Sequence, residues 1–213
     1  MVPTLVDNDR VIIESTIICE YIDDQWPDQP LKPRDSFGRA QMRPWTKQLD
    51  EGLHSAVGTL SFCVAFRHQW IARSAEERAK WLANIPQLER RQRLQSTLDL
   101  GLDSPFFMPA FERYYKPFDD FEIALDRSLW LVDEGFSLAE IGYAPYLARL
   151  RHLGFGALFD RHPRVSQWSE RVAKRPSVEE GVERWFNPKY LALFEEKRPG
   201  VISRMSRLVN PGP

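Results

Sequence analysis

The sequence predicts a mainly helical protein that begins with a short β-hairpin. Past residue 35, apolar residues recur at three- and four-residue steps along most of the chain, which is the period of amphipathic helices. Strand-like composition is confined to residues 2–6 and 10–13, and prolines at 27–33 separate this start from the helical remainder. These observations indicate two unequal parts joined by a short connector.

The hairpin is predicted from its two β-rich runs and the polar residues between them. The Asp-Asn-Asp sequence at 7–9 consists of short side chains that tolerate the backbone geometry of a tight turn. Glu14 and Ser15 then begin a helix, because apolar residues follow them at helical spacing. The first unit is therefore expected over 1–27.

The connector is predicted at 28–34. Proline fixes φ and donates no backbone hydrogen bond, so Pro27, Pro30 and Pro33 favour an extended segment over a helix or a sheet strand. An all-helical domain is expected to follow over 35–213.

A long helix is predicted from Asp35, its N-cap, to about Arg67. Pro44 lies inside this helix, where it removes a backbone hydrogen bond, so a bend is expected near Ala40. The residues of its core-facing stripe are Met42, Trp45, Leu49, Leu53, Val57, Leu60 and Val64.

The stretch 73–104 is expected to be a surface insertion between core helices. Ser74 and Glu77 fit a capping box, in which each side chain accepts from the other residue's free amide, so a helix is predicted to start there. Pro86 begins a second, mostly polar helix. The three arginines at 90–93 are interpreted as its solvated face, and a specific anion site is the less favoured alternative.

A second capping box gives the strongest local signal in the chain. Ser137 and Glu140 occupy its two positions, and Phe136 and Ile141 fit the accompanying hydrophobic staple. Gly154 fits a C-terminal cap. The helix between these signals is expected to have sharply defined ends.

Two more helices are predicted near the C-terminus, because Pro163 and Pro176 each suit a first helical turn. Residues 187–213 are expected to form a tail over a cleft between the two domains, with Trp185 and Phe186 packed beneath it.

Composition argues against several classes of function. The net charge of −1 favours neither nucleic acid nor an anionic membrane as a partner. No apolar run approaches the roughly 20 residues that span a bilayer. Two cysteines make no disulfide framework and the start of the chain has no secretory pattern, so a cytoplasmic location is expected. The four histidines lack metal-ligand spacing, so no metal site is expected.

The motifs, taken in order, resemble the cytosolic glutathione S-transferase family. The matching stretches are VPTLV, VIIESTIICEYIDDQWP, RAQMRPWTKQLDEGL, SLAEI and HPRVSQWSERVAKRPSV. The resemblance covers nearly the whole chain and implies a partial thioredoxin-like domain, the hairpin plus helix, followed by the family's all-helical C-terminal domain. The runs ESTIICEYI and MRPWTKQLDEGL and the long insertion are similar to bacterial β-etherase-like members, which cleave aryl ethers with glutathione.

The resemblance implies that one end of the hairpin binds glutathione as a co-substrate. Pro3 is expected to be cis, so that the Val2 backbone faces outward and pairs with the cysteinyl part of glutathione. Glu14 and Ser15 lie at a helix start, where free amides and the helix dipole favour the γ-glutamyl carboxylate. Asp50 is expected to reach glutathione bound to the neighbouring subunit of a homodimer. Taken alone, Ser15 is an ordinary N-cap and Glu14 a first-turn acid.

The resemblance also implies a site for a small hydrophobic electrophile between the domains. A face of the long helix, offset from the core stripe, carries His54, Gly58 and Phe62, which mix polar, small and aromatic groups as a pocket wall does. Tyr114 and Tyr143 are further candidates. The alternative for each residue is ordinary surface, dimer contact or core.

Two classes of function remain open. The first is an enzyme that performs thiol transfer or glutathione-dependent ether cleavage; the second is a non-catalytic ligand-binding or interaction module of the same fold. The family's thiol-activating residue belongs to a segment that would precede Met1, so the catalytic residue is unknown and the chain is expected to be inactive without that segment. Cys19 and Cys63 are interpreted as small buried hydrophobes and not as catalytic substitutes.

Overall fold

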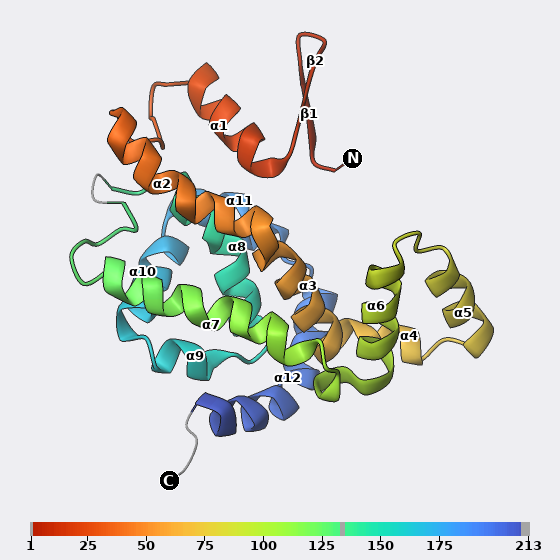
Figure 1. Ribbon diagram of the computed structural model, residues 1–213. Coiled ribbons are helices and arrows are strands. Elements are labelled where there is room, and N and C mark those ends of the chain that lie inside the picture. The colour runs from red at the N-terminus through yellow and green to blue at the C-terminus, as the bar shows by residue number, and fades with distance from the viewer. Residues whose placement is uncertain (1, 133–134, 210–213) are drawn as a thin grey trace.

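A computed structural model describes residues 2–132 and 135–209 of the chain. Figure 1 shows a two-stranded hairpin and one helix lying along the edge of a larger group of helices. The predicted fold class, mainly helical with a β-hairpin at the start, is therefore confirmed.

The hairpin consists of β1 (Thr4–Asp7) and β2 (Arg10–Ile13), which pair antiparallel. Asn8 and Asp9 form its two-residue turn with φ values of 46° and 65°. This left-handed conformation suits the right-handed twist of a hairpin, and Asn and Asp tolerate it. The turn predicted from the polar residues is confirmed.

Hydrogen bonds tie α1 (Ser15–Gln25) to the segments on both sides of it. The Tyr21 hydroxyl donates to the carboxylate of Asp7 at 2.6 Å, which holds the helix against the hairpin. The buried carboxylate of Asp23 accepts from the backbone amides at 31 and 32, at 2.6 and 3.2 Å. The proline-rich connector is thus folded back onto the helix that precedes it.

A long helical rod crosses the molecule from Ser36 to Ile71 (Figure 1). Asp35 caps it by accepting from the Gly38 amide at 2.6 Å, as predicted. Its segments in order are α2 (Ser36–Gln48), π-helical η1 (Leu49–Leu53), α3 (His54–Ser61), π-helical η2 (Phe62–Phe66) and α4 (Arg67–Ile71).

The backbone of the rod leaves helical geometry at Gly52, where φ is 146°. Glycine adopts this value because it has no Cβ to clash with the backbone. From Pro44, a bend is expected near Ala40, but Pro44 lies within the continuous helix α2. The break in helical geometry lies further along the rod, in η1.

The insertion consists of α5 (Ala75–Ala83) and α6 (Leu88–Leu100), which project at one end of the molecule (Figure 1). Its capping box is formed as predicted: the Ser74 amide donates to the Glu77 carboxylate at 3.0 Å, and the Glu77 amide donates to the Ser74 hydroxyl at 3.2 Å. Trp81 of α5 stacks on Phe62 and Trp70 of the rod, with ring centroids 5.8 and 4.0 Å away. These rings fasten the insertion to the rod.

The core lies between the rod, α7 (Phe107–Ala124), α8 (Leu138–His152) and α10 (Pro163–Ala173). Pro163 and Pro176 occupy the first turns of α10 and α11 (Pro176–Gly181), as predicted. Short elements complete the chain order: 3₁₀ turns at Gly101–Asp103 (η3) and Glu183–Trp185 (η4), and α9 (Gly156–Asp160). The predicted stripe of the rod is buried in this core or packs against it.

Both ends of α8 match the expectation. The Ser137 amide and hydroxyl donate to the Glu140 carboxylate at 2.9 and 2.7 Å. The second oxygen of that carboxylate accepts from the Leu131 amide at 2.7 Å. At the far end, Gly154 has φ 91°, and the Phe155 amide donates to the Leu150 carbonyl at 3.0 Å, which closes the helix.

The C-terminal segment is α12 (Pro188–Val209), a helix that contacts η2, α8 and α9. Phe194, Val201 and Met205 are buried, so this helix belongs to the core. Trp185 is 78% exposed, which corrects the expectation that it packs beneath a tail. Within the described ranges, no helix combines the length and the apolar character that crossing a membrane requires.

Candidate functional site

The register of the hairpin brings the predicted glutathione-binding residues to one end of the ribbon. Thr4 lies opposite Ile13, so residues 2–3 and 14–15 leave the ladder at the same end. The Val2–Pro3 peptide bond is cis, as the resemblance implies. Val2 is 95% exposed and lies outside the ladder.

Glu14 has an unusual backbone for a residue with a side chain. Its φ and ψ are 69° and 121° at the N-cap of α1, and its carboxylate makes no capping hydrogen bond. Such conformations cost about 1–3 kcal/mol and are concentrated at functional sites. The first amides of α1 have no partner within the helix, so the exposed carboxylate of Glu14 lies beside a set of free donors.

Asp50 lies next to this helix start within the same chain. The Thr16 hydroxyl donates to the Asp50 carboxylate at 2.7 Å, and Thr16 follows Ser15 directly. The π-helical segment η1 carries Asp50, which is exposed. Four of the five predicted glutathione-binding residues share the hairpin end, and this bond places the fifth close to them.

A hollow of about 780 Å³ separates α1 from α2 beside Asp50. Glu20 on one wall and Arg43 on the other form a two-point ion pair at 2.8 and 3.1 Å. The hydrogen bonds from Arg43 hold the pKa of Glu20 below its ordinary value. The pair fixes the spacing between the two helices.

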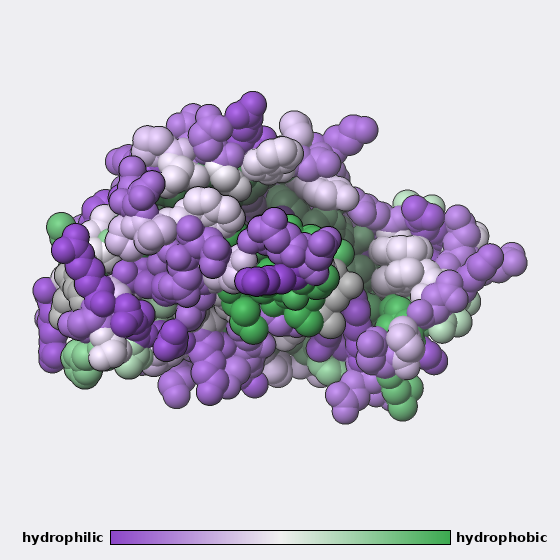
Figure 2. Space-filling model, turned by 90° about the horizontal axis from the view of Figure 1, so that it is seen from above, coloured by the Kyte–Doolittle hydropathy of each residue, from purple (hydrophilic) through white to green (hydrophobic). Residues whose placement is uncertain are grey.

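Apolar side chains are exposed along the hairpin and α1. Figure 2 shows hydrophobic side chains gathered in the middle of the face seen from above, over the position of the hairpin in Figure 1. The exposed apolar residues of the hairpin and α1 include Val2, Val6, Val11, Ile13 and Ile17.

A second hollow, of about 410 Å³, lies between the rod and the insertion. Three of the predicted electrophile-binding residues line it together on the rod side: His54, Gly58 and Phe62. The opposite wall is formed by Arg90, Arg93, Leu94 and Thr97 of α6. The structure therefore brings these three candidates to one cavity.

The comparisons with known proteins agree with this geometry. The chain matches the models of the glutathione S-transferase N-terminal domain over residues 1–30 and C-terminal domain over residues 104–176. It is 30% identical to the protein LigF of Sphingobium sp. strain SYK-6 over 190 residues, covering 86% of this chain and 74% of LigF. The chain belongs to the glutathione S-transferase family.

Solved structures and plant relatives support the same assignment. The crystal structure of the beta-etherase LigF gives a TM-score of 0.72 and covers 86% of this chain and 78% of LigF. Glutathione transferase F2 of Populus trichocarpa shares the fold, with a TM-score of 0.61, 21% identity, and coverage of 86% of this chain and 74% of its own. Glutathione S-transferase U7 of Arabidopsis thaliana is 44% identical over 54 residues, 25% of this chain and 24% of that protein. The resemblance stated from the motifs is confirmed.

Two tyrosines proposed for the electrophile site of this family member lie in the core instead. Tyr114 is 1% exposed and its hydroxyl donates to the Leu53 carbonyl at 2.8 Å. Tyr143 is fully buried and its hydroxyl donates to Gln48 at 2.8 Å. Burial raises the pKa of both hydroxyls, so they act as structural donors.

Tyr146 is a residue that the sequence analysis missed. Its hydroxyl lies 3.1 Å from Nδ1 of His54, and His54 lines the second hollow. Burial and the nearby charge of Asp50 raise the pKa of Tyr146. One signal was available: Tyr146 lies one helical turn after Tyr143, on a helix already predicted.

The two cysteines of the chain are poorly suited to form thiolates. Burial raises the pKa of Cys63 to about 12 and also raises the pKa of Cys19. Both shifts agree with the interpretation of these residues as small hydrophobes.

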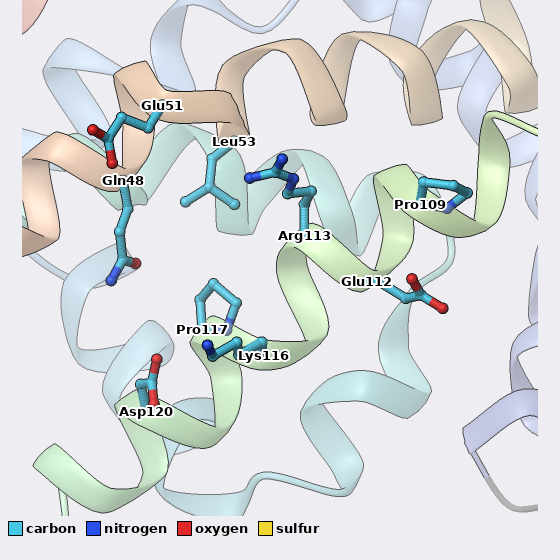
Figure 3. Close-up of a pocket in the computed structure, with 9 residues that line it drawn as sticks. All are labelled: Gln48, Glu51, Leu53, Pro109, Glu112, Arg113, Lys116, Pro117 and Asp120. Carbon is cyan, nitrogen blue, oxygen red and sulfur yellow. The ribbon is translucent and has the colours of Figure 1, made fainter.

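A third hollow, of about 500 Å³, lies between η1 and α7 (Figure 3). Figure 3 shows the Arg113 side chain pointing from α7 toward Leu53 of the rod. A Cβ at Gly52 would meet the Arg113 guanidinium at 3.4 Å, so the glycine leaves room for this close approach. Charges of both signs line the hollow: Glu51, Glu112, Arg113, Lys116 and Asp120.

Proposed function

We propose that this protein binds glutathione at the hairpin end and a small hydrophobic electrophile in the hollow between the rod and α6. The reaction is thiol transfer to that electrophile or glutathione-dependent cleavage of an ether. The observation that carries the proposal is the meeting of Val2, Glu14, Ser15 and Asp50 at one helix start.

The hairpin end suits the two charges of the γ-glutamyl group. The free amides at the start of α1 and its dipole favour the carboxylate. The carboxylates of Glu14 and Asp50 are both exposed and can accept from the ammonium group. The outward backbone of Val2 offers the strand-like donors and acceptors that a peptide recognises.

The hollow beside α6 suits an aromatic electrophile. Phe62 and Leu94 supply apolar walls, and Gly58 leaves space because nothing lies within 4 Å of a Cβ built there. LigF, which is 30% identical to this chain over 190 residues, is a beta-etherase, and this supports ether cleavage as the reaction. In that step the glutathione sulfur attacks the carbon that bears the ether oxygen. The C–S bond forms, the C–O bond breaks, and a phenolate leaves.

The test is release of 4-nitrophenolate from an aryl ether in the presence and absence of glutathione. The assay uses this chain preceded by a thiol-activating segment of the family, since no residue of the 213 is assigned that role. For that protein the proposal predicts release that depends on glutathione, saturates with both substrates and falls for Phe62→Ala. Saturable glutathione binding without any release would support the non-catalytic alternative instead.

We also propose that the functional unit is a homodimer that uses the η1–α7 hollow. A two-fold axis places a surface against its own copy, so a patch with both signs of charge can pair with itself. Glu51, Glu112 and Asp120 beside Arg113 and Lys116 give such a patch.

A further inference from the structure

The wall that α6 contributes to the hollow between the rod and the insertion carries two arginines, Arg90 and Arg93. Arg90, Arg93, Leu94 and Thr97 occur at helical spacing, so one face of α6 points at the rod. Neither Arg90 nor Arg93 forms an ion pair with any residue in the described part of the chain. None of the described residues that line the hollow is a carboxylate.

Arg91, between them in the sequence, has a different role. It donates to the Ile85 carbonyl at 3.0 and 2.7 Å and so anchors the turn before α6. The other end of α6 is held by Arg67 of the rod, which donates to the Leu98 carbonyl at 3.0 and 2.8 Å. Because both ends are fixed, the wall that carries Arg90 and Arg93 is held in position beside the rod.

The geometry points to an electrophile that carries an anionic group, specifically an aryl carboxylate. This inference rests on the proposed function, since it concerns the same hollow, and it deepens that function by naming the substrate class. The aromatic part lies against Phe62 and Leu94, and the carboxylate lies against Arg90 and Arg93. Guanidinium groups pair with carboxylates through charge-assisted hydrogen bonds with two parallel contacts.

The hollow is expected to bind an aryl carboxylate more tightly than a neutral aryl ether. A neutral ligand would gain the apolar contacts but would leave both guanidinium groups with water alone. Arg90 is exposed and Arg93 is partly buried, so the expected preference is modest, about tenfold in Kd, which corresponds to about 1.4 kcal/mol.

The test compares 4-phenoxybenzoate with its neutral analogue 4-phenoxybenzamide by calorimetric titration of the full chain. The wild-type protein is expected to bind the carboxylate about tenfold more tightly than the amide. Arg90→Gln/Arg93→Gln is expected to remove this preference and to leave the Kd of the amide unchanged. Arg127→Gln is the control, because it removes a positive charge just beyond the end of α7. This variant is expected to keep the preference for the carboxylate.

Equal affinity of the wild-type chain for the two ligands overturns the inference, as does a preference that survives in the double variant. If neither ligand binds, the inference fails together with the electrophile site of the proposed function. Carboxylate preference in a protein that does not bind glutathione supports the inference and contradicts the proposed function. Each single variant, expected to lose part of the preference, replaces the double variant if the latter does not fold.

Discussion

Glu14 links backbone strain to ligand binding at a single residue. Its φ of 69° is a conformation that glycine adopts without penalty, and its side chain is exposed and makes no capping bond. Glu14→Gly is therefore expected to raise the free energy of unfolding by about 1 kcal/mol. It is also expected to weaken glutathione binding about tenfold, because the acceptor for the ammonium group is lost.

Urea unfolding and calorimetric titration with glutathione measure the two effects. Asn8→Gly serves as the control: Asn8 also has a positive φ, 46°, but asparagine tolerates this region and lies in the hairpin turn. A Glu14→Gly variant that gains stability and keeps full glutathione affinity would remove Glu14 from the site.

At the scale of one element, the start of α8 depends on a single carboxylate. Glu140 has 0% exposure and accepts from the Leu131 amide, the Ser137 amide and the Ser137 hydroxyl. Glu140→Ala leaves these buried donors without an acceptor, so we expect a loss of about 3 kcal/mol or more in the free energy of unfolding.

The exposed capping box of α5 provides the matched control. Glu77→Ala removes the same kind of bond, but water replaces it, so its loss is expected to be much smaller. Chemical denaturation measures both variants. Similar losses for the two variants would show that burial is not what makes the α8 box important.

The packing of α12 on α8 is expected to depend on pH. His152 makes ring contacts with Phe186 and Phe194, at centroid distances of 4.8 and 6.3 Å. Burial, and then the charges of Arg149 and Arg198, lower the pKa of His152 below its ordinary value of 6.5. The folded chain therefore binds this proton less readily than the unfolded chain, so stability falls as pH falls below about 6.5.

Thermal unfolding between pH 7.5 and 5.0 measures this dependence. His152→Gln is expected to flatten the curve in part. The remaining slope comes in part from His68, whose pKa burial also lowers. An unchanged slope in His152→Gln would exclude His152 as a source of the dependence.

At the scale of the whole molecule, the η1–α7 hollow is proposed to join two copies of the chain. Light scattering is expected to give about twice the chain mass of 24.9 kDa. Arg113→Glu makes the patch predominantly acidic, so like charges repel across the two-fold axis and the dimer is expected to dissociate. Arg127→Glu is the charge-matched control. A monomeric wild-type protein would contradict the proposal.

Local signals in the sequence predicted much of this fold. The two capping boxes, the Asp35 cap, the turn at 7–9 and the stripe of the rod all depend on residues within a few positions of one another. Their physical causes, capping hydrogen bonds and helical periodicity, can be read from single segments.

The rest depends on contacts that no local pattern carries. The π-helical segments rotate the side chains that follow them away from the helix face that a 3.6-residue period assigns. The rod leaves helical geometry at Gly52, although Pro44 is the stronger signal for a break in the sequence. His54 and Tyr146 lie 92 positions apart, so their meeting required the tertiary fold. Arg90 is exposed and Arg93 is partly buried, so the predicted solvated face holds for Arg90. The sequence does not say that this face of α6 meets the rod across a hollow, because that depends on the tertiary fold.

Calorimetric titration of the wild-type chain and of Ser15→Ala with glutathione determines whether the end of the hairpin holds glutathione. We expect one saturable site per chain for the wild type and weaker binding for Ser15→Ala, whose hydroxyl lies at the first turn of α1. No saturable heat with the wild-type chain, or equal affinity for the two proteins and for Glu14→Gly, would contradict it.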